Sequence, residues 1–371
     1  MGAGIPAPIR SALVLALIYL FLVGVSSLEA GIKIMGADTQ ERLFSTVSNP
    51  IAGLSVGILG TVLVQSSSAS TSVIVGLVAS GALGVDAAVP MVMGANIGTT
   101  VTNTLVSLAH VRQSAEFKRA FAAATVHDFF NVLAVLVLLP LEVVFGLISG
   151  IAEAASELLV GSAGTEWKSP VKAWVKEPVG WLEGAWAMTD AAQTLLGTLM
   201  VISGLIIILL ALTFITKNMR TLVADRVERS VNAILGKGGG AVAMALGVVI
   251  TIAVQSSSIT TSILIPLSAA GVIALRNAYP ITLGANVGTT ITALLAALAA
   301  SRPEALTVGL AHTTFNVAGI IVLYVIPFAR DVPVRLAEGL AEIAARQRTW
   351  AAAYVMGAFI IVPLIGVTVL G

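Results

Sequence analysis

Cysteine does not occur among the 371 residues, so the chain has no disulfide and no thiolate ligand for a metal. Charge is also scarce. Charged residues make up 11% of the chain, and the formal net charge of +1 provides no electrostatic attraction to nucleic acid. The sequence lacks a basic block interleaved with aromatic residues, which proteins that bind single strands need. We therefore expect no nucleic-acid partner.

Hydrophobic residues, in contrast, form 57% of the chain, and the mean hydropathy is +0.99. This composition excludes an ordinary soluble domain and a disordered chain, and it predicts an all-α polytopic protein embedded in the lipid bilayer. We expect it in the cell (inner) membrane. Residues 1–30 also have the layout of a signal peptide, but a matching apolar segment in the second half of the chain favours a membrane span.

An internal repeat divides the chain into two halves. Residues 65–104 and 255–294 align without a gap at an offset of 190, and 18 of the 40 aligned positions are identical. The identities concentrate in two motifs, Gln-Ser-Ser-Ser (QSSS) and Gly-Ala-Asn-x-Gly-Thr-Thr (GAN-x-GTT). These motifs stand at 65–68 and 94–100 in the first half and at 255–258 and 284–290 in the second.

The duplication extends beyond these motifs, since His127 and Asn131 recur as His312 and Asn316. We divide the chain into a first repeat, a connecting helix with an extracytoplasmic loop, a second repeat, and an amphipathic segment with a final transmembrane helix. The expected boundaries of these four parts are 11–145, 146–194, 195–330 and 331–371.

Each half is predicted to contain a re-entrant helical hairpin and a broken transmembrane helix. About 20 residues are needed to cross a bilayer, and the apolar runs on either side of each QSSS motif are shorter. We therefore expect a hairpin with QSSS at its tip, covered by protein or by a water-filled cavity. GAN-x-GTT interrupts a longer apolar run with two glycines and three polar side chains, which predicts the broken helix. The expected elements are 12–25, 29–49, 51–82, 91–108, 121–139 and 141–160 in the first half, then 195–216, 217–240, a hairpin around Gln255, 279–300, 305–327, 330–348 and 350–370.

The distribution of basic residues predicts the orientation. Lys and Arg gather in 110–119, 217–240 and 330–348, and the positive-inside rule makes these segments cytoplasmic. Residues 29–49, which match 217–240, have two basic residues against three acidic ones and so fall outside. Corresponding elements then lie on opposite faces, so the two halves are inverted-topology repeats. The N-terminus is expected in the cytoplasm and the C-terminus outside, with the Trp-rich stretch 161–192 as an interfacial loop.

The two hairpin tips and the two broken helices would gather short polar side chains at the midplane. Half-helix N-termini there attract an anion, and freed carbonyl and hydroxyl oxygens suit a cation such as sodium. Arg276, at a hairpin end, is the one basic residue in these segments. An anion would therefore need co-bound cations, which predicts coupled symport. The other interpretation of both motifs is helix packing through small residues and hydrogen bonds, and two copies in register favour a site.

Asp128 is the one carboxylate well inside a predicted span. An acid at that depth indicates a cation ligand or a proton carrier; the alternative is a structural acid bonded to neighbouring hydroxyls. Thr313 stands at the matching position of the second half, so any charged role belongs to one half. We expect His127 and His312 to be helix-packing residues rather than ligands.

With these motifs in view, the chain resembles the type II sodium-dependent phosphate cotransporter family. The resemblance runs from residue 12 to about 362. Besides QSSS it includes PMVMGANIGTTVTNTLVSL, FKRAFAAATVHDFFNVLAVLVLLPLEV and AYPITLGANVGTTITALLAALA. It implies a bacterial member, and we expect no PhoU-like regulatory domain because the chain has no room for one.

The resemblance implies that a sodium gradient drives uptake of inorganic phosphate, as HPO₄²⁻, by alternating access. It implies no enzymatic activity, no cofactor beyond co-transported Na⁺, and no metal other than sodium. A homodimer is one possible assembly. The phosphate ligands implied are Gln65, Ser66, Ser67, Ser68, Gln255, Ser256, Ser257 and Ser258. The sodium ligands expected are Asn96, Thr99, Thr100, Asp128, Asn131, Asn286, Thr289, Thr290 and Thr292.

Asp128 also bears on the charge that transport carries. In the animal family an acid at this position accompanies electrogenic transport and a glycine marks the electroneutral member, so the resemblance predicts electrogenic transport. Animal members differ in having Gln and Asp where His110 and Gln113 stand, which places one sodium site in question. They also have a larger, disulfide-bearing loop in place of 161–192, and a further span after the last one here.

Other functions remain open from the residues alone. One is a sodium-coupled symporter of another oxyanion, such as arsenate or sulfate. Another is an intramembrane serine hydrolase that uses a QSSS serine with His127 and Asp128. The sequence has no Gly-x-Ser-x-Gly elbow, and adjacent residues of a helix point about 100° apart, which disfavours that triad. A channel-like or purely structural membrane protein is the third alternative.

Overall fold

Helices make up the whole regular structure of the part of the chain described by the computed structural model, which confirms the all-α class. The described residues are 6–36, 47, 49–160, 169, 171–189, 192–234 and 239–371. Within them, six helical stretches are long and apolar enough to cross a membrane. These are Ala7–Met35 (α1), Ser114–Phe145 (α7), Gln193–Val223 within α10 (Gln193–Ile234), Leu275–Ala299 (α13), Pro303–Val325, and Thr349–Leu370.

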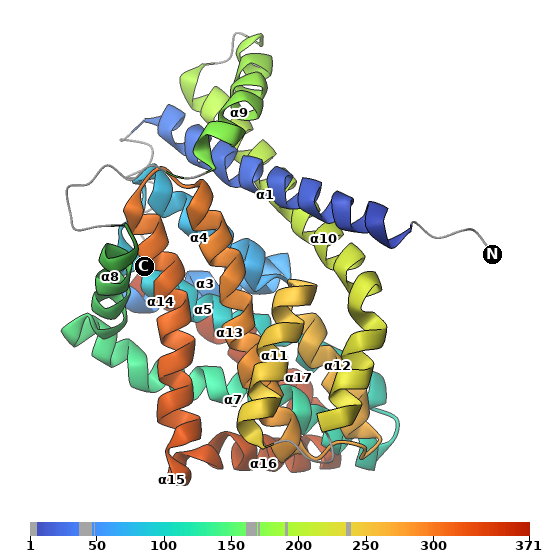
Figure 1. The fold of residues 1–371 in the computed structure, drawn as a ribbon. Helices are drawn as coiled ribbons and strands as arrows, with labels where there is room; N and C mark the ends of the chain where they lie inside the picture. The colour runs from blue at the N-terminus through green and yellow to red at the C-terminus, as the bar shows by residue number, and fades with distance from the viewer. Residues whose placement is uncertain are drawn as a thin grey trace.

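The first spans of the two halves, α1 and α10, pack against each other at glycines. A Cβ atom on Gly31 would lie 2.7 Å from the carbonyl oxygen of Gly197, and one on Gly204 would lie 2.7 Å from the backbone nitrogen of Leu28. Such an approach of two backbones requires glycine at the contact. In Figure 1 the two helices cross in the upper part of the molecule.

Each QSSS motif joins two short helices. The first pair is Pro50–Val64 (α3) and Ser67–Ser80 (α4), and the second is Gly240–Val254 (α11) and Ser257–Ala269 (α12). A helix rises 1.5 Å per residue, so each is about 20–23 Å long against a hydrocarbon core of about 30 Å. The helix–turn–helix units therefore form where they were expected, and their re-entry into the membrane stays a prediction.

The expected break at GAN-x-GTT is wrong in the second half, where α13 runs uninterrupted from Leu275 to Ala299. In the first half, Val85–Thr99 (α5) and Val101–Ser107 (α6) are separated by Thr100, whose φ of −78° and ψ of −17° remain right-handed. In both halves the motif glycine serves close packing and not unwinding: a Cβ on Gly94 would overlap the carbonyl oxygen of Leu54 in α3, and one on Gly284 would overlap that of Met244 in α11.

Three further segments differ from their expected form. The stretch predicted as an interfacial loop contains Lys172–Ala187 (α9), and 217–234 continues α10 instead of forming a separate element. Of the expected element 29–49, residues 29–35 end α1, and 37–46 and 48 lie outside the described residues. The remaining helices are Leu108–His110 (η2), Leu147–Val160 (α8), Pro303–Ile320 (α14), Ile321–Val325 (η3), Pro327–Arg330 (α15), Val332–Arg346 (α16), Thr349–Met356 (α17), Gly357–Ile361 (η4) and Val362–Leu370 (α18).

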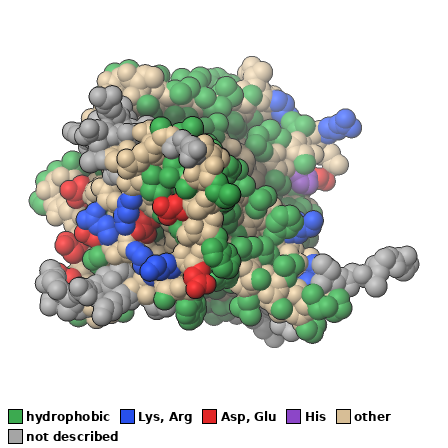
Figure 2. Space-filling model, turned by 90° about the horizontal axis from the view of Figure 1, so that it is seen from above, with side chains coloured by type: hydrophobic (Ala, Val, Ile, Leu, Met, Phe, Trp, Pro, Cys, Tyr) green, Lys and Arg blue, Asp and Glu red, His purple; other side chains and the backbone are tan. Residues whose placement is uncertain are grey.

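A buried acid fastens α1 to the connection between α13 and α14. Glu29, 4% exposed, accepts hydrogen bonds from Lys33 at 2.6 Å and from the backbone of Ser301 at 3.3 Å, and the Ser301 hydroxyl also contacts it. Figure 2 shows one face of the molecule, on which acidic and basic side chains gather at the left, further basic side chains lie along the right edge, and hydrophobic side chains cover much of the area between. Such charges belong at a membrane surface, since they are costly in hydrocarbon.

Replacement of Gly94 by leucine is expected to destabilise the protein by about 2–3 kcal/mol or more, because the new side chain would force α5 and α3 apart. Gly60→Leu is the matched control, since a Cβ at Gly60 on α3 meets no atom within 4 Å. Thermal unfolding of the purified protein in detergent measures both. Equal unfolding midpoints for the two variants would contradict the packing role of the GAN-x-GTT glycine.

Candidate functional site

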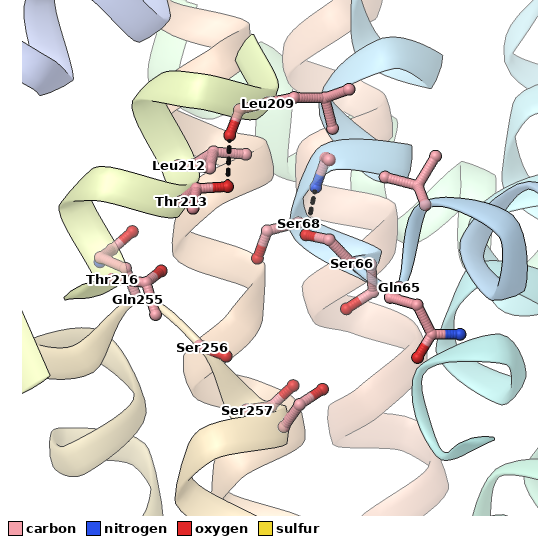
Figure 3. Close-up of a pocket in the computed structure, with 14 residues that line it drawn as sticks. Gln65, Ser66, Ser68, Leu209, Leu212, Thr213, Thr216, Gln255, Ser256 and Ser257 are labelled. Carbon is pink, nitrogen blue, oxygen red and sulfur yellow. Dashed lines mark hydrogen bonds between the residues drawn. The ribbon is translucent and has the colours of Figure 1, made fainter. Parts of the chain in front are cut away.

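Both QSSS motifs open into one pocket of about 250 Å³, far more than the roughly 30 Å³ that one water occupies. Figure 3 shows the two motifs facing each other across it, with α10 on a third side. The lining residues are Val64, Gln65, Ser66, Ser67, Ser68, Ala69, Leu209, Leu212, Thr213, Thr216, Gln255, Ser256, Ser257 and Ser258. The structure therefore brings together all eight residues predicted to bind phosphate.

The two motifs adopt the same turn. Gln65 has φ 56° and ψ 28°, and Gln255 has φ 57° and ψ 30°. These are the two non-glycine residues with positive φ in the described part of the chain. A left-handed glutamine carries a conformational cost that persists where the surroundings enforce it, often at functional sites. The repeated strain indicates that the turn itself serves a purpose.

The glutamine side chains stabilise this turn through hydrogen bonds. Gln65 donates from Nε2 to the carbonyl of Val62 at 2.6 Å and accepts from the hydroxyl of Thr102 at 2.9 Å. Gln255 accepts in the same way from Thr292 at 3.2 Å. Both amide groups therefore already have protein partners. Thr292, a predicted sodium ligand, is thus the hydrogen-bond partner of the second glutamine.

The first serine of each motif caps the helix that follows. The hydroxyl oxygen of Ser66 accepts from the backbone nitrogen of Ala69 at 3.2 Å, and that of Ser256 accepts from Ile259 at 3.3 Å. As a result, α4 and α12 both begin at the pocket. The N–H groups of a first helical turn lack intrahelical acceptors and carry the positive end of the helix dipole. Two such ends at one cavity supply the N–H donors and the positive potential that an anion needs.

The second and third serines supply free hydroxyl groups. Ser67, Ser68, Ser257 and Ser258 line the pocket, and none of their hydroxyls has a hydrogen-bond partner among the described residues. In each motif the glutamine and the first serine thus hold the backbone, and the next two serines present donors to the cavity.

No described residue that lines the pocket is charged. Two lining residues on α10, Thr213 and Thr216, were missed in the sequence. Thr213 donates its hydroxyl to the carbonyl of Leu209 at 2.7 Å, and the hydroxyl of Thr216 has no partner in the described structure. Two threonines one turn apart in an apolar span were the available signal, but threonine in a helix usually bonds to its own backbone.

Three predicted sodium ligands belong to a buried network between the two halves. His127 Nε2 lies 2.5 Å from Asn286 Oδ1, so this nitrogen carries the imidazole proton and donates. Asn286 Nδ2 donates to Asn131 Oδ1 at 2.7 Å, and Asn131 Nδ2 donates to the carbonyl of Asn96 at 2.8 Å. The asparagine of the second half is thereby held by two residues of the first half.

The same arrangement occurs with the halves exchanged. His312 Nε2 lies 3.0 Å from Asn96 Oδ1, and Asn96 Nδ2 donates to Asn316 Oδ1 at 3.2 Å. This reciprocal exchange fits the helix-packing role expected for the histidines. None of these asparagines lines the QSSS pocket, and their sodium role stays a prediction.

The threonines of GAN-x-GTT differ in their hydrogen bonding. Thr99, Thr100 and Thr290 donate to backbone carbonyls of their own helix at 3.0, 2.7 and 2.8 Å. Thr289 is 3% exposed, and its hydroxyl has no partner among the described residues. Thr289 is therefore the member of this set with an uncommitted donor and acceptor.

Asp128 lies in α7 and is 1% exposed. Its Oδ2 accepts from the hydroxyl of Tyr354 at 3.1 Å and lies 3.3 Å from the hydroxyl of Thr104, whose one proton is shared with the carbonyl of Thr100 at 3.2 Å. Its Oδ1 is buried and has no hydrogen-bond partner in the described structure. The carboxylate does not line the QSSS pocket. Thr104 and Tyr354 were not among the predicted residues, since neither stands in a motif.

Comparison with known proteins gives one family and several relatives. The family described as Na⁺/Pi-cotransporter matches residues 20–153 and 207–335. Sodium-dependent phosphate transport protein 2B of Bos taurus is 34% identical over 95% of this chain and 64% of its own length. Protein 2A of Rattus norvegicus is 34% identical over 95% of this chain and 66% of its own length. The chain thus spans about two thirds of these relatives, and no solved structure matches it.

Proposed function

Because the chain belongs to the Na⁺/Pi-cotransporter family, we propose that it is a secondary active symporter that couples inward sodium movement to uptake of inorganic phosphate. The observation that carries the proposal is the pocket at which two helix N-termini and four free serine hydroxyls meet. Its relatives are named as transport proteins, and the proposed function is transport rather than catalysis.

The pocket chemistry suits a tetrahedral oxyanion. Serine hydroxyls and first-turn N–H groups all donate, and a dianion such as HPO₄²⁻ accepts at every oxygen that is not protonated. Figure 3 shows Ser68 on one side of the pocket and Ser257 on the other, and Ser67 and Ser258 also line it. A substrate held between them would contact both halves at once.

The missing charge supports sodium coupling. No described lining residue is basic, so the pocket does not neutralise a dianion by itself. An ion pair of substrate and co-bound cations lowers the cost of placing that charge in a low-dielectric site. Hydroxyl and carbonyl oxygens are suitable ligands for sodium, and we propose Asp128 and Thr289 as two of them, from the buried oxygens without partners.

The same proposal includes the arrangement in the membrane. We propose inverted repeats, re-entrant QSSS hairpins and a cytoplasmic face that carries 110–119 and 330–348. Contacts that join those two segments support a common face, namely an ion pair of Lys118 with Glu342 and a hydrogen bond from Arg348 to Ser114 at 2.8 Å. Alternating access would move the hairpins against the glycine-packed pair of α1 and α10.

The competing functions are weaker on these observations. In a serine hydrolase the histidine would bond to the nucleophile, whereas His127 Nε2 contacts Asn286 and lies outside the QSSS pocket. Another oxyanion remains the second candidate, since the same donors would bind arsenate or sulfate. Sulfate and HPO₄²⁻ carry the same charge, and the O–H group of HPO₄²⁻ distinguishes them.

Purified protein in liposomes is expected to accumulate labelled phosphate when an inward sodium gradient is imposed, because the uncharged pocket needs sodium to hold a dianion. Uptake with potassium or choline in place of sodium is expected to fall at least about tenfold. Arsenate should compete and sulfate should not. Uptake that is indifferent to sodium would contradict the proposal, and sulfate uptake in place of phosphate would favour the second candidate.

A further inference from the structure

The last helical stretch, Thr349–Leu370, lies outside both repeats and outside the residues that the family matches. Of its 18 most apolar consecutive residues, 17% are buried within the protein, so most of the stretch faces the surroundings. It nevertheless makes a hydrogen bond to a buried residue. Tyr354 of α17 reaches α7 and donates its hydroxyl to Asp128 Oδ2 at 3.1 Å.

The two oxygens of Asp128 have different environments. Oδ2 receives hydrogen bonds from Tyr354 and Thr104, and the Thr100 hydroxyl also lies near the carboxyl group, whereas Oδ1 meets no donor with hydrogen-bond geometry in the described structure although it is buried. A buried carboxylate oxygen without a partner is costly, because it has lost its water and gained nothing in exchange. A cation at Oδ1 would remove that cost. The two hydroxyls on Oδ2 would then fix which oxygen faces the ion.

Tyr354 is held in place by aromatic rings. Its ring centroid lies 6.5 Å from that of Phe121, 6.2 Å from Phe129 and 6.1 Å from Phe359. Phe359 belongs to η4, a π-helical segment that begins three residues after Tyr354 and places Phe359 against it. Single π-helical turns occur frequently at functional sites. The phenol is thus positioned by packing on three sides, as a residue that orients another group must be.

The same stretch also contacts a QSSS hairpin. α18 packs on α3, where Gly366 lies against the hydroxyl of Ser55 with no room for a Cβ atom. The stretch Thr349–Leu370 therefore contacts Asp128 through α17 and the first QSSS hairpin through α18. Any movement of α3 relative to α7 would bear on the contact between Tyr354 and Asp128.

We propose that Tyr354 is a positioning residue for sodium binding, which with Thr104 orients the Asp128 carboxylate so that Oδ1 faces the cation. The proposal rests on the sodium-coupled function proposed above and adds to it a residue from the unduplicated C-terminal helix. Tyr354 itself does not bind the ion. It acts by holding a charged ligand in one rotamer and by donating to the oxygen that the ion does not use.

The test compares Tyr354→Phe with the wild type and with Tyr279→Phe. Tyr279 is the matched control, since it is 2% exposed and its hydroxyl has no partner among the described residues, so its loss removes no hydrogen bond. We expect Tyr354→Phe to raise the sodium concentration for half-maximal phosphate uptake about tenfold, the equivalent of one hydrogen bond to a charged group. Maximal uptake at saturating sodium should stay within about twofold, and Tyr279→Phe should change neither quantity.

A binding measurement separates this proposal from the proposed function. Sodium is titrated against the thermal unfolding midpoint in detergent, with choline chloride keeping the ionic strength constant. We expect wild type and Tyr279→Phe to be stabilised over the same sodium range, and Tyr354→Phe to need about ten times more. An unchanged sodium range in Tyr354→Phe overturns the positioning role, even if transport is sodium-coupled. Sodium binding that Tyr354→Phe weakens, in a protein that moves no phosphate, supports the role and rejects the symporter.

Discussion

Replacement of both Ser67 and Ser257 by alanine is expected to raise the phosphate concentration for half-maximal uptake about 100-fold or more. Each serine presents to the pocket a hydroxyl that has no partner among the described residues. A hydrogen bond to a charged group contributes about 1.5–3 kcal/mol, and 1.4 kcal/mol corresponds to a tenfold change in affinity. Two such bonds from opposite sides of the dianion therefore account for the expected loss.

The substitution keeps the turn intact, because the capping hydroxyls of Ser66 and Ser256 remain. Ser70→Ala is the matched control. It removes a buried hydroxyl without a partner from the same helix, but Ser70 lines an apolar cavity next to the QSSS pocket instead of the pocket itself. Initial uptake rates over a range of phosphate concentrations, with sodium saturating, measure all variants. A double variant with the phosphate affinity of Ser70→Ala would disprove the assignment of these hydroxyls to the substrate.

Replacement of Asp128 by glycine is expected to abolish the current that phosphate evokes while some phosphate uptake remains. The carboxylate is buried in α7 and Oδ1 has no partner in the described structure, so its removal eliminates a negative charge that can hold an additional cation. One net positive charge per HPO₄²⁻ requires three sodium ions, and the loss of one of them would leave a translocated complex with no net charge. Simultaneous recording of current and labelled uptake in the same cells gives the charge moved per phosphate.

Thr313→Gly tests whether this effect belongs to one half. Thr313 occupies the matching position of the second repeat and donates to the carbonyl of Gly309 at 3.4 Å. The variant should keep the current per phosphate of the wild type, since it removes no charge. Undiminished current in Asp128→Gly would show that the additional charge is bound elsewhere.

Much of the architecture could be predicted from local features of the sequence. The hydropathy of 12–25, 305–327 and 350–370 indicated membrane-length helices, and the structure has them. The recurrence of QSSS inside short apolar runs predicted the helix–turn–helix at both places. These predictions succeeded because helix formation in an apolar chain depends on residues a few positions apart.

Predictions failed where a neighbouring helix decided the outcome. GAN-x-GTT has the composition of a helix break, yet α13 is continuous because its glycines accept the backbone of α11; a Cβ on Gly284 would overlap the carbonyl oxygen of Met244. Nothing within 275–299 reveals that partner. Likewise, the sequence predicted one role, phosphate binding, for all four residues of each QSSS motif. The hydrogen bond between Gln65 and Thr102, 37 residues away, shows that the glutamine amide is already paired, whereas the second and third serines are free.

The sequence by itself determined the class of the protein, its duplication and the two motifs, since composition and repetition are properties of the chain alone. The tertiary structure decided which polar groups are already paired and which remain free. His127 with Asn286 and Asp128 with Tyr354 are partners 159 and 226 residues apart. A buried polar group in a membrane protein must find its partner wherever packing brings one, so distance along the chain does not predict it.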